Sequence, residues 1–141
     1  GSVTVTEGQI SASFTINTTG VLNDVTATIT ATVGAVSVTD TLVVSAAGLI
    51  EVRFSPSRVR GGALTTLTVR LDSAAPPGGA VVSLTSSDPS LATIPATITI
   101  DANTFSKTVS IPTRRVSRSL ATQVSATYGD TTLFTILVVG R

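Results

Sequence analysis

Apolar and polar residues alternate with a period of two along most of this chain. In residues 47–141 the alternation predicts eight short strands, one of which carries Leu67, Val69 and Leu71 on a single face. The eight lie near 51–54, 64–71, 80–85, 91–94, 96–100, 105–112, 122–128 and 131–139. Short strands at intervals of about 8–12 residues are typical of a two-sheet β-sandwich, and a closed barrel is the structural alternative.

Turn-forming residues and composition support this prediction. Glycine, proline and aspartate gather between the predicted strands, and Gly129-Asp130 between two alternating runs predicts a tight hairpin. Threonine and valine make up nearly a third of the chain, and both are β-branched residues that favour strands.

The chain also repeats itself. Residues 2–44 align with residues 97–139 without a gap at an offset of 98 − 3 = 95, and 11 of the 43 positions are identical. At other positions one apolar residue aligns with a different apolar residue, such as Val5 with Ile100 and Phe14 with Val109. We therefore divide the chain into a complete repeat, residues 47–141, and the C-terminal half of another, residues 1–46.

The half repeat predicts four strands, near 3–6, 10–18, 26–33 and 36–45. Its inward-facing residues would be Val5, Phe14, Ile16, Ile29, Val38 and Leu42. Half a sandwich buries too little surface to be stable alone and leaves open strand edges. We therefore expect its missing half to come from the preceding segment of the same parent chain, or from a strand or half domain of a neighbouring subunit.

Two positions depart from simple alternation. Asp40 shares the inward parity of Val38, and we expect a bulge or strand end to turn it outward, because a buried charge is costly. Phe134, Ile136 and Val138 make the other face of the last strand apolar as well, where the half repeat has Thr39, Thr41 and Val43. We expect this stripe to contact the preceding half repeat or another chain.

The charge balance and residue types exclude several kinds of chemistry. Charged residues are 12% of the chain and the net charge is +1, which argues against nucleic acid or an anionic membrane as the main partner. The absence of cysteine and histidine excludes disulfides, metal sites built on these residues, and histidine-based catalysis. No apolar run is long enough for a membrane-spanning helix. We predict that the protein is not an enzyme and has no cofactor.

Weaker candidates for a site remain. The acidic residues are spread singly over turns, so a cation bound at Asp88 or Asp101 is a minor alternative. Arg114, Arg115 and Arg118 cluster in one loop, where a solvated loop is a simpler interpretation than an anion site. The few aromatic residues Phe14, Phe105 and Tyr128 fit core or hairpin positions better than a stacking surface.

Several stretches of the complete repeat resemble a known family. The run Phe54-Ser55-Pro56-Ser57, the pair Gly61-Gly62 and the stretches GGAVVSLTSSDPSLATIPATITI, FSKTVSIPT and VSATYGD resemble the bacterial immunoglobulin-like repeats of large secreted and cell-surface proteins. The turn at Asp101 to Asn103 departs from the family, in which a Pro/Ala-Gly turn is more usual. The half repeat's Glu7-Gly8 is closer to that pattern.

The resemblance implies an immunoglobulin-like β-sandwich that works outside the cell. We therefore expect a non-catalytic structural module of an extracellular or cell-surface bacterial protein, acting as a stalk, a spacer or a fibre-forming unit. Its partners would be neighbouring copies of the same repeat, including copies in other subunits of a fibre. The alternative is an adhesive or accessory module that recognises a glycan or a protein.

Overall fold

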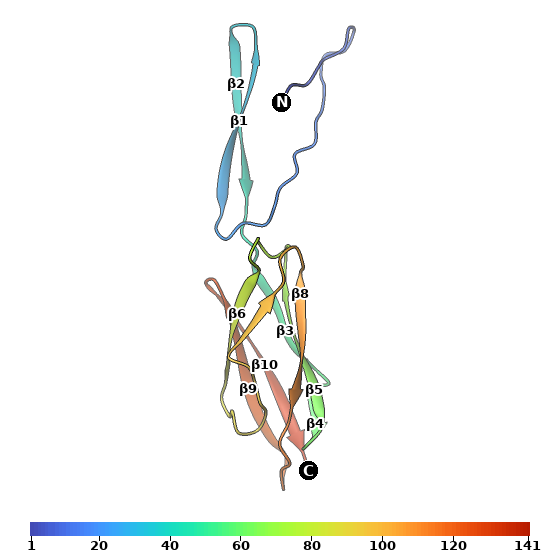
Figure 1. Ribbon diagram of the computed structural model, residues 1–141, viewed down its shortest axis with the longest axis vertical. Helices are drawn as coiled ribbons and strands as arrows, with labels where there is room; N and C mark the ends of the chain where they lie inside the picture. Colours follow the sequence, from blue (N-terminus) through green and yellow to red (C-terminus); the bar gives the residue numbers. More distant parts are fainter.

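The computed structural model describes all 141 residues, and every regular element in it is a β-strand. The ten strands are β1 (Val25–Val33), β2 (Val36–Val44), β3 (Leu49–Ser55), β4 (Arg58–Arg60), β5 (Leu64–Leu71), β6 (Ala80–Ser86), β7 (Thr97–Ile100), β8 (Ser106–Pro112), β9 (Leu120–Tyr128) and β10 (Thr131–Gly140). No helix that could cross a membrane is found. The molecule is long and narrow, with the β1–β2 hairpin at one end and the other strands packed together at the other (Figure 1).

Strands β3 to β10 form a two-sheet sandwich. One sheet has the order β4-β10-β9-β6-β7 and the other the order β3-β5-β8. All neighbours are antiparallel except β4 and β10, which run parallel. The chain crosses between the sheets after β3, β4, β5, β7 and β8. The predicted all-β sandwich is therefore confirmed.

The core lies between these two sheets. In β5, Thr65, Leu67, Val69 and Leu71 are buried, while the residues between them are exposed or half-buried. The other strands contribute in the same alternating way to one cluster of 21 buried apolar residues, all within residues 47–139. Burial of apolar surface is the main stabilising term of such a fold.

Most strands of the complete repeat lie where the sequence predicts them. The bounds of β5 match the predicted 64–71, and Gly129-Asp130 closes the predicted hairpin between β9 and β10. The predicted strand 91–94 is wrong, because that segment makes only an isolated bridge between Ala92 and Thr113. The segment is apolar for another reason: Leu91 and Ala92 lie in the β6–β7 connection and are buried against the core.

Two other features of the complete repeat differ from expectation. The sequence gives no sign of β4, a three-residue edge strand that pairs with Val138–Gly140. Phe105 is 55% exposed, because it lies in the turn just ahead of β8 and not on an inward position of the strand. Tyr128, by contrast, packs against the core as expected.

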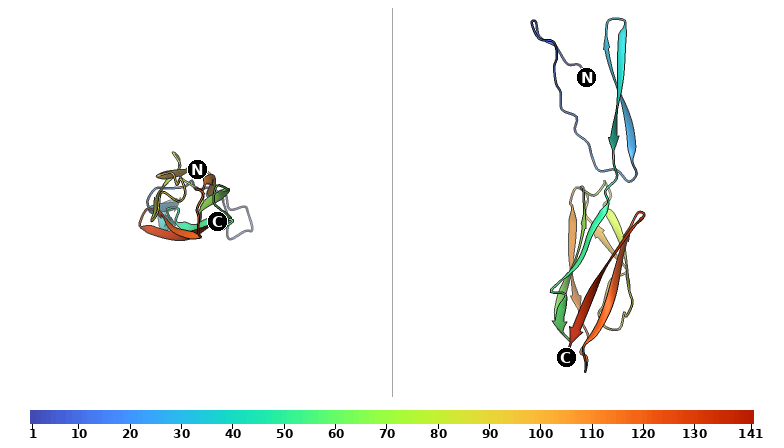
Figure 2. Two further views of the ribbon diagram at one scale, coloured as in Figure 1. Left: turned by 90° about the horizontal axis from the view of Figure 1, so that it is seen from below. Right: turned by 180° about the vertical axis from the view of Figure 1, so that it is seen from behind.

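The half repeat contains a hairpin and no other strand. The predicted strands at 3–6 and 10–18 do not form (Figures 1 and 2). Their counterparts in the complete repeat are β7 and β8, which pair with β6 and β5, and residues 1–46 contain no equivalent of either partner. The hairpin forms because β1 and β2 pair with each other.

Candidate interaction surface

The β1–β2 hairpin has the same strand register as the β9–β10 hairpin of the complete repeat. Its nine pairs run from Val25↔Val44 to Val33↔Val36, and adding 95 to each number gives the nine pairs of β9 with β10. Gly34 and Gly129, which close the two hairpins, both have positive φ, at 60° and 56°. In the complete repeat β9 also pairs with β6, and β10 with β4. Both outer edges of the β1–β2 hairpin lack such neighbours.

A second turn is also shared. The only backbone hydrogen bond of residues 1–24 is donated by the Gln9 amide to the Thr6 carbonyl at 3.0 Å. Its counterpart is the bond from the Thr104 amide to the Asp101 carbonyl, also 3.0 Å. Gly8 and Asn103 occupy equivalent places with φ of 80° and 62°. The turn at Asp101 therefore has the same geometry as the turn of the half repeat.

Exposed apolar side chains are concentrated in the half repeat. Of the 17 large hydrophobic residues that are exposed, 11 lie before residue 46: Val3, Val5, Ile10, Phe14, Ile16, Leu22, Val25, Val33, Val36, Val38 and Val43. Val5 is 50% exposed, whereas its counterpart Ile100 is 0% exposed. A concentration of apolar surface on this scale marks an interaction surface. We call residues 2–44 the open half.

The six residues that the sequence predicts to face inward in the open half are not buried. Val5, Phe14, Ile16 and Val38 are exposed, and Ile29 and Leu42 are only half-buried, because no second sheet covers them. Asp40 is likewise exposed and lies in a regular pair with Ile29, so the expected bulge or strand end is wrong. Its carboxylate accepts a hydrogen bond from the Thr41 amide at 2.8 Å.

A short junction joins the open half to the sandwich. The Asp24 carboxylate accepts a hydrogen bond from the Ala46 amide at 2.8 Å, and the Asp72 carboxylate accepts one from the Gly48 amide at the same distance. Gly20 lies against the β5–β6 connection so closely that an added Cβ would be 2.8 Å from the Ala74 carbonyl oxygen. From sequence these aspartates could be identified only as turn residues. Their role depends on contacts across 22 and 24 residues of chain.

The predicted stripe on β10 lies on the outer face of the five-stranded sheet. Phe134 is 67% exposed, Ile136 is 54% exposed and Val138 is half-buried. Phe134 also lines a shallow hollow with Ile50 and Val52 of β3. Whether the stripe contacts another module or chain stays a prediction.

The arginine loop borders the other hollow of note. Arg114, Arg115 and Arg118 line a space of about 320 Å³ together with Asp88 and Ser90 of the β6–β7 connection. The Asp88 carboxylate accepts hydrogen bonds from the amide and the hydroxyl of Ser90, at 3.0 and 2.6 Å. Asp88 thus stabilises its own turn. No group of three or more acidic side chains that could hold a metal ion lies together in the structure.

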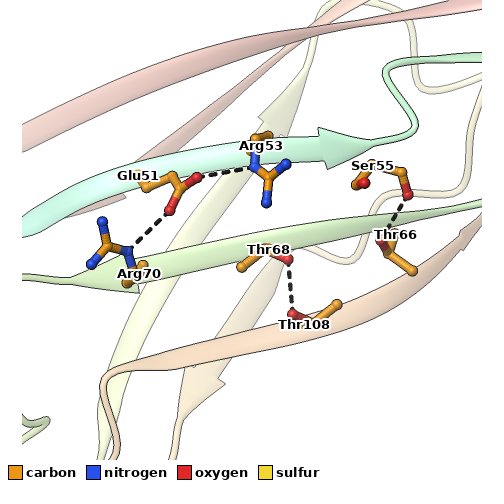
Figure 3. A network of polar contacts seen from close by, with 7 residues as sticks. All are labelled: Glu51, Arg53, Ser55, Thr66, Thr68, Arg70 and Thr108. Atoms are coloured by element: carbon orange, nitrogen blue, oxygen red, sulfur yellow. Dashed lines mark hydrogen bonds and ion pairs between the residues drawn. The ribbon is translucent and has the colours of Figure 1, made fainter.

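A polar network covers the outer face of the three-stranded sheet (Figure 3). The Glu51 carboxylate lies 3.0 Å from Nε of both Arg53 and Arg70. The hydrogen bond from Arg70, reinforced by Arg53, lowers the pKa of Glu51 below its ordinary value. Thr68 and Thr108 share a hydrogen bond of 2.8 Å between β5 and β8. Its separate contacts join β3 to β5 and β5 to β8 (Figure 3), and its residues lie on the alternate positions that are exposed or half-buried.

Comparison with known proteins finds only a distant similarity to solved structures. No protein-family model matches the sequence, and no curated protein sequence matches it. Among solved structures, the chain is similar to domains 4 and 5 of the S-layer protein SbsC, with 19% identity and a TM-score of 0.46 over 82% of this chain and 58% of the other. It is also similar to the S-layer protein rSbsC(31-844), with 19% identity and a TM-score of 0.47 over 82% of this chain and 16% of the other. At this level of similarity, neither structure indicates a function for this chain.

Proposed function

We propose that the protein is a non-catalytic structural module of an extracellular or cell-surface bacterial protein, in which successive copies form a stalk, a spacer or a fibre. The observation that carries this proposal is the path of the chain through the complete repeat. The chain enters the sandwich at the junction beside Gly48 and leaves it beyond β10 at the opposite end (Figures 1 and 2). Copies joined in this way extend in a line, and each copy contacts only its neighbours.

The junction supports the same proposal. The hydrogen bonds of Asp24 and Asp72 hold the linker at both of its ends, and Gly20 lies directly against the sandwich. Contacts at both ends of a short linker restrict bending between modules, which suits a stalk. The sequence resemblance to bacterial immunoglobulin-like repeats adds the location outside the cell.

Antibody labelling of intact cells tests the location and the shape together. Gold-labelled antibodies against residues 47–141 should decorate the surface of unopened cells, and electron micrographs should show the label on extended projections. Label that appears only after the cells are permeabilised would contradict the proposal. A compact particle in place of a projection would contradict the stalk and favour an accessory binding role.

A further inference from the structure

The open half keeps the local elements of its counterpart and lacks those that need a distant partner. Its hairpin and its Glu7-Gly8 turn match those of the complete repeat, whereas the equivalents of β7 and β8 are unpaired. We infer that residues 2–46 complete a second β-sandwich by pairing with a polypeptide segment that has the strand pattern of residues 47–96. This pairing concerns how the half repeat folds, and it would hold whatever the parent protein does.

The complete repeat shows which edges such a segment would occupy. Strand β6 pairs with both β7 and β9. Subtracting 95 from the residue numbers of β7 and β9 gives the equivalent positions in the open half. A β6-like strand would therefore lie between residues 2–5 and residues 29–32. In the same way a β5-like strand pairs with residues 11–17, and a β4-like strand lies beside the end of β2. One segment therefore supplies a neighbour for both predicted strands that do not form and for both outer edges of the hairpin.

Residues 47–96 of this chain cannot serve this role themselves. Val69 of β5 and Val82 of β6 are fully buried in the existing sandwich, and both strands are paired on two sides. A second copy of the chain holds the same residues in the same way. The partner is therefore a separate segment. It joins most directly ahead of Ser2, because in the complete repeat residue 96 leads straight into β7.

Two of the positions at which the repeats differ would lie close to this partner. Asp40 stands where the complete repeat has Thr135, which is only half-buried, so its carboxylate would keep access to water. Ala27 stands where the complete repeat has Thr122, whose hydroxyl binds Ser86, Ser87 and Asp88. The partner therefore does not need the Ser-Ser-Asp sequence that begins at the last residue of β6.

A fusion protein tests the inference. A second copy of residues 47–96 is joined directly ahead of Ser2 of the full chain, and amide hydrogen exchange is measured along the whole protein. We expect exchange in residues 2–5, 11–17 and 25–44 to slow at least about a hundredfold, since those amides would open only with the new sandwich. The original residues 47–141 serve as an internal reference.

The matched control carries Val69→Asp and Val82→Asp in the added copy only. It should leave exchange in the open half as fast as in the unfused chain, because a charge at either site prevents core formation. Unchanged exchange in the unmodified fusion would overturn the inference. So would slow exchange of the open half in an unfused chain that sediments as a dimer, because the occupant would then be a second copy.

A cysteine pair checks the register independently, since the chain has no cysteine of its own. Val81 pairs with Thr99 in the complete repeat, so Val81→Cys in the added copy should form a disulfide with Thr4→Cys within one molecule. Ser2→Cys, two residues out of register, should do so poorly. Equal cross-linking of both pairs, or cross-links only between molecules, would contradict the inferred pairing.

Discussion

Residues 2–44 and 97–139 have the same pattern at a spacing of 95 residues, yet only the second is folded into a sandwich. Leu137 is 0% exposed, while its counterpart Leu42 is half-buried at the surface of a free hairpin. The two copies agree in every feature that depends on neighbouring residues, namely the hairpin register and the positive-φ turns. They differ where a strand needs a partner from residues 47–96. The difference separates what this sequence encodes locally from what it encodes through distant pairing.

The hairpin of the open half shows how far local pairing reaches. Nine residue pairs close around a two-residue turn at Gly34, so the entropy lost in closing the loop is small. A two-stranded hairpin without a covered face is nevertheless only marginally stable in water. We therefore expect β1 and β2 to open far more easily than β9 and β10.

The largest effect should come from a matched pair of leucine substitutions. Leu137→Ala leaves a cavity in the core and should lower the free energy of unfolding by about 2–5 kcal/mol. Leu42→Ala, at the equivalent position of the open half, should change the same unfolding transition by less than about 0.5 kcal/mol. Urea denaturation of the full chain measures both. Similar losses for the two variants would mean that the open half is packed into the same cooperative unit.

A smaller effect should come from a buried hydroxyl that only the complete repeat has. Thr122 Oγ1 lies 2.8 Å from the Ser86 hydroxyl and 3.2 Å from that of Ser87, and it accepts a hydrogen bond from the Asp88 amide at 3.1 Å. Thr122→Val leaves these groups without their partner and should cost about 1–3 kcal/mol.

Thr127→Val is the matched control for Thr122→Val. It removes only an exposed hydrogen bond to Thr132, so it should be close to neutral. Thermal unfolding separates the two variants. A neutral Thr122→Val would show that this hydroxyl does not stabilise the β6–β7 connection.

The ion pairs of Glu51 should give the complete repeat a weak dependence on acid pH. Because Arg70 and Arg53 lower the pKa of Glu51 in the folded protein, their contribution is fully present above the ordinary value of 4.5. It is lost as the pH falls through the lowered folded pKa. The loss should stay below about 1 kcal/mol, since the pairs lie at the surface.

Comparison with Glu51→Gln isolates this contribution. The variant should be less stable than the original chain at neutral pH, and the difference should shrink as the pH is lowered below 4.5. Denaturation at a series of pH values measures the difference. A stability difference that grows toward acid pH would contradict the lowered pKa of Glu51.

The smallest effect on stability should come from the apolar stripe on β10. Ile136→Thr gives this strand the residue that β2 has at Thr41, and it should change stability by less than about 0.5 kcal/mol, because Ile136 is largely exposed. It should reduce self-association at high concentration if the stripe contacts another molecule or module. Sedimentation of both proteins measures this. Equal self-association of the two proteins would show that the stripe does not contact another molecule.

The sequence predicts the complete repeat well, since alternation and turn residues suffice for strands such as β5 and β10. It fails where burial has another cause, as at Leu91 in the β6–β7 connection, and where a strand is too short to alternate, as in β4. In the open half, alternation around Phe14 predicts a strand that does not form. Alternation reports which face a strand would present, but a strand also needs a neighbour to bond with.

The interaction surface is predicted only in part. The repeat and the expectation of a missing half follow from the alignment at 95 residues. The junction contacts of Asp24 and Asp72 do not, because an aspartate in a turn looks the same whether it bonds locally or across the chain. The pairing of Glu51 with Arg70 depends on the β3–β5 register and is likewise hidden from the sequence.

Amide hydrogen exchange of the unmodified chain tests most directly whether the open half lacks only its partner strands. The amides that pair β9 with β10 should exchange at rates set by unfolding of the whole sandwich. The equivalent amides of β1 and β2 should exchange at least about a thousandfold faster, because only a marginal hairpin protects them. Equal protection of the two hairpins in a monomeric chain would contradict the account, since the open half would then be stable without any partner.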